Sequence, residues 1–496
     1  MHFTTRMRIA GLFAVVGITA ASGVAYFNRD RSVPVRPLVW SSCGHDFDCS
    51  SLEVPIDYNH PNGKTIILAL TRLPAGDATH RIGSLVLNPG GPGASGIDFA
   101  HEAMLSFPAA VRARFDIVGF DPRGVGQSAP VVCDDGTVSP SPAVTATPDS
   151  AAAGDRPLTA VAAYTEGCRR NTGDELSHVD TVSSARDIER IRVALGETSL
   201  SYFGYSYGSL LGATYADLYP SHVRAFVLDG AIDPRLNYED FQQEQALAAE
   251  TALQSFFADC ASRPECPFHN DGNPQAHFES LRQSLNGAPL VVPYPSGAVL
   301  SISGYALNEA ARLGLYSSAG WKALAQALAD AEFRGDGKGL ATLLSFEGPD
   351  PGSRTARNFE SAGTVIDCLD RPIPDTNELD QFYTKLTAEA PHFGYGSIAE
   401  AAYCWSFNLP RNDAPHALHA KGSAPILVVG TKGDPVTPYT WAQSLAGQLS
   451  SGRLLTWSGY GHTASFHVPS VSTCIDSAVT AYLVDLVLPD DGKICD

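Results

Sequence analysis

Short apolar runs alternate with helical patterns along most of this chain. Residues 181–195 show the helical pattern, and six apolar runs are predicted strands: 85–87, 115–120, 201–203, 224–228, 425–429 and 453–457. Continuous apolar runs of this length are typical of parallel strands covered by helices on both faces. Residues 51–56 and 64–73 predict an antiparallel start. The sequence therefore predicts an α/β fold with a mostly parallel sheet.

A long insertion separates two of these predicted strands. The strand ending at Leu228 and the strand beginning at Pro425 should be neighbours, yet roughly 200 residues lie between them. An insertion at the carboxyl edge of such a sheet covers the crevice where ligands bind. Within it, helical patterns occur at 241–257, 305–333 and 379–388. The predicted division is a leader at 1–27, core at 38–232, a helical cap at 233–410 after the sixth core strand, and core again at 411–496.

The segment Gly204-Tyr205-Ser206-Tyr207-Gly208 stands between a predicted strand and a helix predicted at 210–216. Strand, Gly-x-Ser-x-Gly and helix form the nucleophile elbow of α/β hydrolases, in which a strained turn exposes the serine hydroxyl. The five-residue pattern alone also fits a glycine-containing strand end.

A serine nucleophile requires a base and a carboxylate that orients the base. In this fold the chain order is Ser, then Asp or Glu, then His. Asp434 and His462 each follow a predicted strand in that order, so the pattern predicts Ser206 as nucleophile, His462 as base and Asp434 as acid. Asp229 is the competing acid, and the alternatives for Asp434 and His462 are a turn residue and a surface histidine.

Two backbone N–H groups are needed to stabilise the oxyanion. Tyr207, the residue after the nucleophile, is one predicted donor. The other comes from the glycine-rich loop after strand 85–87, where Gly91 is favoured over Gly90. This loop lacks the Lys-Ser/Thr pair of a phosphate-binding P-loop.

Charge and composition limit which kinds of partner and cofactor the protein is expected to bind. The formal net charge of the 496 residues is −19, spread along the chain and without a basic run, which argues against nucleic acid as a partner. No Cys-x-x-Cys pair is present, so the sequence predicts no metal site, and the proposed chemistry needs no organic cofactor. We expect a monomer.

The N-terminus has the pattern of an export signal. Arg6 and Arg8 precede an apolar run at 9–27, and small residues at 20–25 offer cleavage points. The run is also barely long enough to span a bilayer, so an uncleaved anchor is the alternative. We expect a secreted protein that contacts a membrane only if this segment is retained.

The cysteines also fit export. An even count behind a signal segment predicts five disulfides. Nearest-neighbour pairing is the expected connectivity, because the first and third pairs would each close a tight local loop. The second pair would tie the base of a Ser- and Pro-rich tract at 136–154. The ten residues are Cys43, Cys49, Cys133, Cys168, Cys260, Cys266, Cys368, Cys404, Cys474 and Cys495.

Four motifs carry a family resemblance: Asn-Pro-Gly-Gly-Pro-Gly-Ala-Ser-Gly at 88–96, Asp-Pro-Arg-Gly-Val-Gly-Gln-Ser at 121–128, the elbow, and Gly-Tyr-Gly-His-Thr at 459–463. Together they resemble the exported tripeptidyl aminopeptidases, which are proline iminopeptidase-like serine peptidases of the α/β-hydrolase fold. The resemblance runs from about Trp40 to the C-terminus, and residues 400–495 look like the family's C-terminal module. It implies the same triad. Pro89 stands where proline iminopeptidases have histidine, which favours the tripeptidyl group.

The resemblance implies a secreted serine exopeptidase that cleaves short peptides near a free N-terminus through an acyl-enzyme. Such an enzyme must hold the α-ammonium of its peptide substrate, and the candidate carboxylates are Glu239, Asp240, Glu244 and Asp370. Each has solvated surface as its alternative. A carboxylesterase or lipase would use the same triad, and a non-catalytic binding protein is a further alternative. Acidic pH should suppress turnover by protonating the histidine base.

Overall fold

The computed structural model describes residues 35–133, 158–293, 299–345, 354–374, 376–410 and 414–496. The predicted leader at 1–27 and the Ser- and Pro-rich tract at 136–154 lie outside these residues. Within the described ranges, no helix has both the length and the apolar character needed to cross a bilayer.

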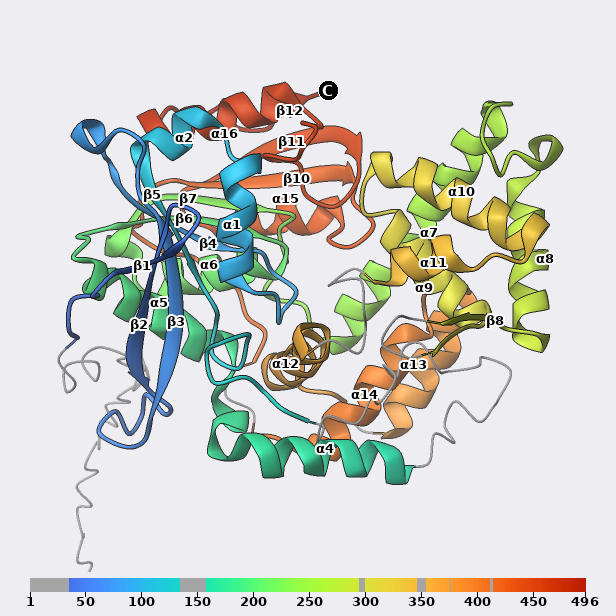
Figure 1. Cartoon of the computed structure of the whole chain (residues 1–496), viewed down its shortest axis with the longest axis horizontal. Coiled ribbons are helices and arrows are strands. Elements are labelled where there is room, and N and C mark those ends of the chain that lie inside the picture. The colour runs from blue at the N-terminus through green and yellow to red at the C-terminus, as the bar shows by residue number, and fades with distance from the viewer. Residues whose placement is uncertain (1–34, 134–157, 294–298, 346–353, 375, 411–413) are drawn as a thin grey trace, which may run out of the picture.

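A ten-stranded sheet forms the centre of the molecule (Figure 1), in the order β1-β2-β3-β5-β4-β6-β7-β10-β11-β12. Strands β1, β2, β3 and β5 pair antiparallel in succession, and every pairing from β5 to β12 is parallel. The predicted antiparallel start and parallel sheet are both confirmed. The strands are β1 (Ser41–Gly44), β2 (Phe47–Pro55), β3 (Thr65–Leu73), β4 (Gly83–Asn88), β5 (Phe115–Phe120), β6 (Leu200–Tyr205), β7 (Val223–Asp229), β10 (Ile426–Gly433), β11 (Gly452–Tyr460) and β12 (Lys493–Cys495).

Helices cover both faces of this sheet (Figure 1). Strand residues alternate between two hydrophobic clusters: Leu85 and Leu87 pack on one side, Val86 on the other. Burial on both faces explains why these strands have continuous apolar sequences. On one face lie α1 (Gly96–Ser106), α2 (Ala109–Arg114) and α16 (Thr473–Asp485), and on the other α5 (Thr181–Leu195), α6 (Tyr207–Leu218) and α15 (Tyr439–Gln448).

Strands β7 and β10 are direct neighbours in the sheet, with Phe226 opposite Ile426. The inserted segment between them lies beside the core (Figure 1) and has a hydrophobic cluster of its own, which includes Phe256, Phe278 and Leu324. Its elements are α7 (Tyr238–Ser262), α8 (Pro274–Gly287), β8 (Leu290–Pro293), β9 (Val299–Ile302), α9 (Gly304–Gly314), α10 (Ser318–Arg334), α11 (Lys338–Leu344), α12 (Arg354–Asp370), α13 (Thr376–Glu389) and α14 (Gly396–Phe407).

Two features of the insertion differ from the sequence expectation. The single helical pattern at 305–333 is divided into α9 and α10, because Ser317 caps α10 by accepting a hydrogen bond from the backbone N–H of Gly320. Helix α12 packs into the main core rather than the cap cluster, through Ala362, Val365 and neighbouring residues. The insertion is therefore not a separate body along its whole length.

The structure pairs the ten cysteines as nearest neighbours, which confirms the expected connectivity. Two of the disulfides close short loops, and Cys368–Cys404 joins α12 to α14. The pairs are Cys43–Cys49, Cys133–Cys168, Cys260–Cys266, Cys368–Cys404 and Cys474–Cys495.

A buried histidine joins several cap helices. His392 Nδ1 lies 2.8 Å from Glu250 Oε2 of α7, and Nε2 lies 2.5 Å from Glu279 Oε1 of α8. Two carboxylate partners require both ring nitrogens to donate, which is the charged form. Burial alone would lower the pKa of His392, but the two glutamates outweigh it and raise that pKa above its ordinary value.

We expect the substitution His392→Gln to lower the free energy of unfolding by about 2 kcal/mol, the scale of hydrogen bonds to charged groups. Because the folded pKa is raised, the stabilisation is complete below the unfolded pKa of about 6.5 and is lost as pH rises through the folded pKa. Urea unfolding at about pH 6 and about pH 10 checks this. His277→Gln, at a half-buried pair with the one carboxylate of Glu332, is the control. An equal loss at both pH values would contradict the expectation.

Candidate active site

Ser206 occupies a strained turn between β6 and α6. Its φ is 54° and its ψ is −122°, a conformation that non-glycine residues rarely adopt. The backbone around it is tightly packed: a Cβ on Gly204 would lie 2.4 Å from the carbonyl oxygen of Gly208, and one on Gly208 would lie 2.7 Å from that of Asn88. Only glycine fits at either position, as the elbow pattern requires.

His462 and Asp434 form a buried hydrogen-bonded pair. His462 Nδ1 lies 3.0 Å from each of the two carboxylate oxygens of Asp434. The Thr437 hydroxyl donates to Asp434 Oδ2 at 2.9 Å, and the backbone N–H groups of Val436 and Thr437 donate to Oδ1 at 2.8 Å. With Nδ1–H directed at the carboxylate, Nε2 is left to accept a proton.

Asp229, the competing acid, has other partners. Its carboxylate accepts hydrogen bonds from the backbone N–H groups of Ala464 and Ser465, and burial raises its pKa. Its backbone carbonyl accepts from the N–H of Ser206 at 2.8 Å. Asp229 thus holds the loop after His462 and the elbow, whereas the carboxylate at the imidazole is that of Asp434.

The glycine loop after β4 lies against the elbow. Gly90 has a φ of +97°, and a Cβ there would lie 3.0 Å from Ser206 Cβ and 3.1 Å from the backbone nitrogen of Tyr207. Gly91 has a φ of +102°, and its Cβ would lie 3.0 Å from the ring of Phe359 in α12. Gly90 therefore faces Ser206 and the elbow, whereas Gly91 faces Phe359 of the cap.

These groups lie at one edge of the sheet because β6, β7, β10 and β11 are adjacent parallel strands. Ser206, Asp434 and His462 all lie at their carboxyl ends or in the loops just beyond, and ligands bind at that edge in open α/β sheets. A family profile described as the alpha/beta hydrolase fold matches residues 83–467. The chain belongs to the α/β-hydrolase family.

Curated relatives of this α/β hydrolase are enzymes. Serine protease Hip1 of Mycobacterium tuberculosis is 36% identical over all of both chains. Tripeptidyl aminopeptidase of Streptomyces coelicolor is 30% identical and covers 90% of this chain and 83% of its own. Carboxylesterase B of M. tuberculosis is 33% identical over 90% of this chain and 86% of its own. The chain is an enzyme of the serine hydrolase class, similar to serine peptidases.

Among solved structures, proline iminopeptidase of Mycobacterium smegmatis is 17% identical, with a TM-score of 0.39, and the match covers 88% of this hydrolase and 99% of that chain.

The cap contributes residues to the candidate active site that no sequence motif predicted. The carbonyl of Tyr316, in the turn between α9 and α10, accepts a hydrogen bond from the backbone N–H of His462 at 2.7 Å. Its ring meets the imidazole edge-on, with centroids 5.3 Å apart. Phe359 covers the glycine loop from α12. Neither position has a sequence signal, because the contacts join segments far apart in the chain.

The four candidate ammonium ligands lie on two helices. Glu239, Asp240 and Glu244 occupy the first turns of α7, and Asp370 ends α12. Partial burial, then the charges of Glu378 and Asp240, raise the pKa of Glu239. Asp240 is exposed.

The other two candidates have hydrogen-bond partners in the protein. Glu244 accepts a hydrogen bond from the indole nitrogen of Trp441 at 2.5 Å, and both oxygens of Asp370 accept from Thr181. In the described part of the chain, no group of three or more His, Cys, Asp or Glu side chains is arranged to hold a metal ion.

We expect Gly90→Ala to lower kcat by at least ~100-fold, the scale of losing one oxyanion donor. The added methyl group would lie 2.5 Å from the carbonyl oxygen of Tyr205 and displace the elbow. Hydrolysis of a p-nitrophenyl ester, together with the thermal melting temperature, measures this. Gly44→Ala is the matched control, because Gly44 has a similar φ of +100° but open space around it. Near-normal activity of Gly90→Ala would contradict the placement of this loop.

Proposed function

We propose that this protein is an exported serine exopeptidase that releases short peptides, tripeptides in particular, from the free N-terminus of peptide substrates. The observation that carries the proposal is the buried Asp434–His462 pair at the strand ends beside the Ser206 elbow. Relatives named serine protease and tripeptidyl aminopeptidase support a peptide substrate.

In the proposed reaction, Ser206 Oγ attacks the scissile carbonyl while His462 Nε2 accepts its proton. Asp434 keeps the imidazole in the required tautomer and stabilises its charged form. The backbone N–H groups of Tyr207 and of the glycine loop, Gly91 or Gly90, stabilise the oxyanion. His462 then protonates the leaving amine, the acyl-enzyme forms, and water activated by the same imidazole releases the N-terminal peptide.

A free-amine requirement calls for a carboxylate that binds the α-ammonium. We favour Glu239, because it is partly buried and lies near the negative charges of Glu378 and Asp240, so a cation would relieve the unfavourable environment that raises its pKa. Asp240 and Glu244 are the remaining candidates on the same helix. Asp370 is less suited, since Thr181 already engages both of its oxygens.

Export is part of the proposal. Five disulfides are typical of proteins that fold in an oxidising compartment, and the N-terminal signal pattern agrees with that.

The decisive experiment compares the purified protein with its Ser206→Ala variant on Ala-Ala-Pro-Ala-Ala and on the N-acetylated peptide, with products identified by mass spectrometry. We expect Ala-Ala-Pro from the free-amine peptide only, and nothing from the variant. Equal cleavage of both peptides would show an endopeptidase. Cleavage of esters but of neither peptide would favour the carboxylesterase alternative. The relative named Carboxylesterase B is the reason for testing that alternative.

We expect Glu239→Gln to raise KM for the free-amine peptide by roughly 10-fold or more, because a charge-assisted hydrogen bond is lost. Turnover of a p-nitrophenyl acetate control, which has no ammonium group, should stay unchanged. Asp240→Asn, at the exposed neighbouring position, serves as the matched variant. If Asp240→Asn alone raises KM, the anchor is Asp240, and an unchanged KM in both variants would remove this part of α7 from the proposal.

A further inference from the structure

Helix α12 packs on the glycine loop and, through Thr181, is linked to Tyr207, so it is connected to both parts of the proposed oxyanion hole. Between Phe359 and Gly363 it packs on the glycine loop: a Cβ on Gly93 would lie 2.4 Å from the carbonyl oxygen of Phe359, and one on Gly363 would lie 2.7 Å from that of Pro92. At its last residue, Asp370, it contacts the start of α5. The disulfide between Cys368 and Cys404 ties the same end to α14.

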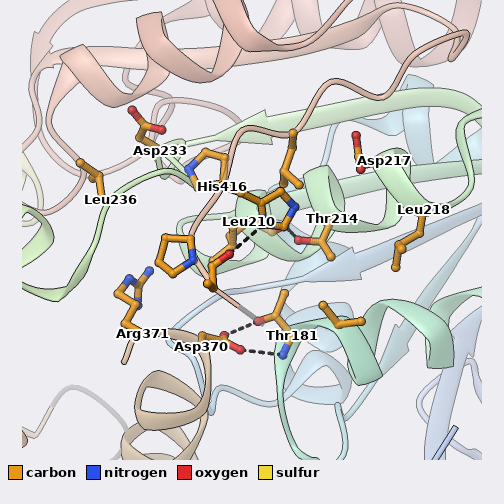
Figure 2. Close-up of a pocket in the computed structure, with 15 residues that line it drawn as sticks. Thr181, Leu210, Thr214, Asp217, Leu218, Asp233, Leu236, Asp370, Arg371 and His416 are labelled. Atoms are coloured by element: carbon orange, nitrogen blue, oxygen red, sulfur yellow. Dashed lines mark hydrogen bonds between the residues drawn. The ribbon is translucent and has the colours of Figure 1, made fainter. Parts of the chain in front are cut away.

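A chain of hydrogen bonds leads from the end of α12 to the elbow. Asp370 Oδ1 accepts from the backbone N–H of Thr181 at 3.0 Å, and Oδ2 accepts from the Thr181 hydroxyl at 2.5 Å. The same hydroxyl lies 2.6 Å from the hydroxyl of Tyr207. Thr181 has a single hydroxyl proton, which it gives to the carboxylate, so the Tyr207 hydroxyl donates to Thr181. Figure 2 shows Asp370 and Thr181 joined in this way.

Tyr207 is the residue whose backbone N–H is the proposed oxyanion donor. Its side chain is 2% exposed and its hydroxyl points to Thr181, away from solvent. Since the Tyr207 ring and its backbone belong to one residue at the first position of α6, a fixed hydroxyl restricts the rotation of the adjoining peptide. Errors of about 1 Å in such a donor are sufficient to cost catalysis.

We propose that Asp370 is a positioning residue for the oxyanion hole, acting through Thr181 on Tyr207 while the rest of α12 holds the glycine loop. This inference rests on the proposed roles of Ser206 and Tyr207. In this proposal α12 sets the distance between the two oxyanion donors, because it holds the glycine loop directly and positions Tyr207 through Asp370 and Thr181.

The environment of Asp370 supports a positioning role for its carboxylate rather than a role in filling space. Burial is the largest influence on this carboxyl and raises its pKa to about 7, against the opposing effect of the Thr181 hydrogen bonds. An apolar residue would pack at lower cost. A cavity also lies beside Asp370, lined by Leu210 and His416 among others (Figure 2). Asp370 and Thr181 both line this cavity, and the two hydrogen bonds between them hold the carboxylate there.

The test uses Asp370→Ala, Tyr207→Phe and the double variant, with Ser361→Ala as the control. Ser361 lies on the same helix and its hydroxyl bonds to that of Tyr164 at 2.9 Å, without reaching the elbow. Kinetics are measured on a peptide and on a p-nitrophenyl ester, together with inhibition by a peptide boronic acid, which forms a tetrahedral adduct with the serine. The wild type and Ser206→Ala are run first, so that failure of the proposed function itself is seen before any variant is interpreted.

We expect Asp370→Ala and Tyr207→Phe each to lower kcat by about 10- to 100-fold with KM within about threefold, less than the full loss of a donor. The boronate inhibition constant should rise in parallel with the fall in kcat/KM, and the double variant should be no worse than the poorer single variant. Ser361→Ala should change neither quantity by more than about twofold.

A fall confined to KM, an unchanged boronate inhibition constant, or additive effects in the double variant would overturn the proposal. If Asp370→Ala does not fold, Thr181→Val takes its place and is combined with Tyr207→Phe in the same double-variant comparison. Tyr207→Phe removes only one oxygen atom. Equal losses in Ser361→Ala would also overturn it, since they would show a general effect of loosening α12.

Discussion

The close approach of backbone to backbone around Ser206 is the constraint on which the site depends. Gly90, Gly204 and Gly208 each lie so near a neighbouring carbonyl oxygen that an added methyl group would clash with it. This packing fixes the glycine loop, the end of β6 and the start of α6 as one unit. The strained dihedral angles of Ser206 persist because the surrounding strands and helices determine them.

The inserted cap is part of this site rather than a cover placed over it. Tyr316 holds the backbone of His462 from the turn between α9 and α10, and Phe359 lies over the glycine loop from α12. Because α12 packs into the core cluster, a movement of the whole cap would have to disturb the oxyanion region.

Buried polar groups hold the site at points where packing alone would leave freedom. In addition to the His462 imidazole, the Asp434 carboxylate accepts four hydrogen bonds. They come from the backbone N–H groups of residues 436, 437 and 463 and from the hydroxyl of Thr437. Asp229 secures the loop that follows His462. Such groups stabilise a site when every oxygen has a partner, and they restrict it to one geometry.

The sequence by itself predicted the parallel sheet, the elbow at Ser206, the histidine base and nearest-neighbour disulfide pairing, because each has a local signature. Apolar runs, glycines at fixed spacing and neighbouring cysteines are all readable within short windows. Only the tertiary structure decided that Asp434 rather than Asp229 meets the imidazole, since both follow strands. It alone also brought Asp370 to Thr181 across 189 residues, because a contact of that range leaves no periodic pattern in either segment.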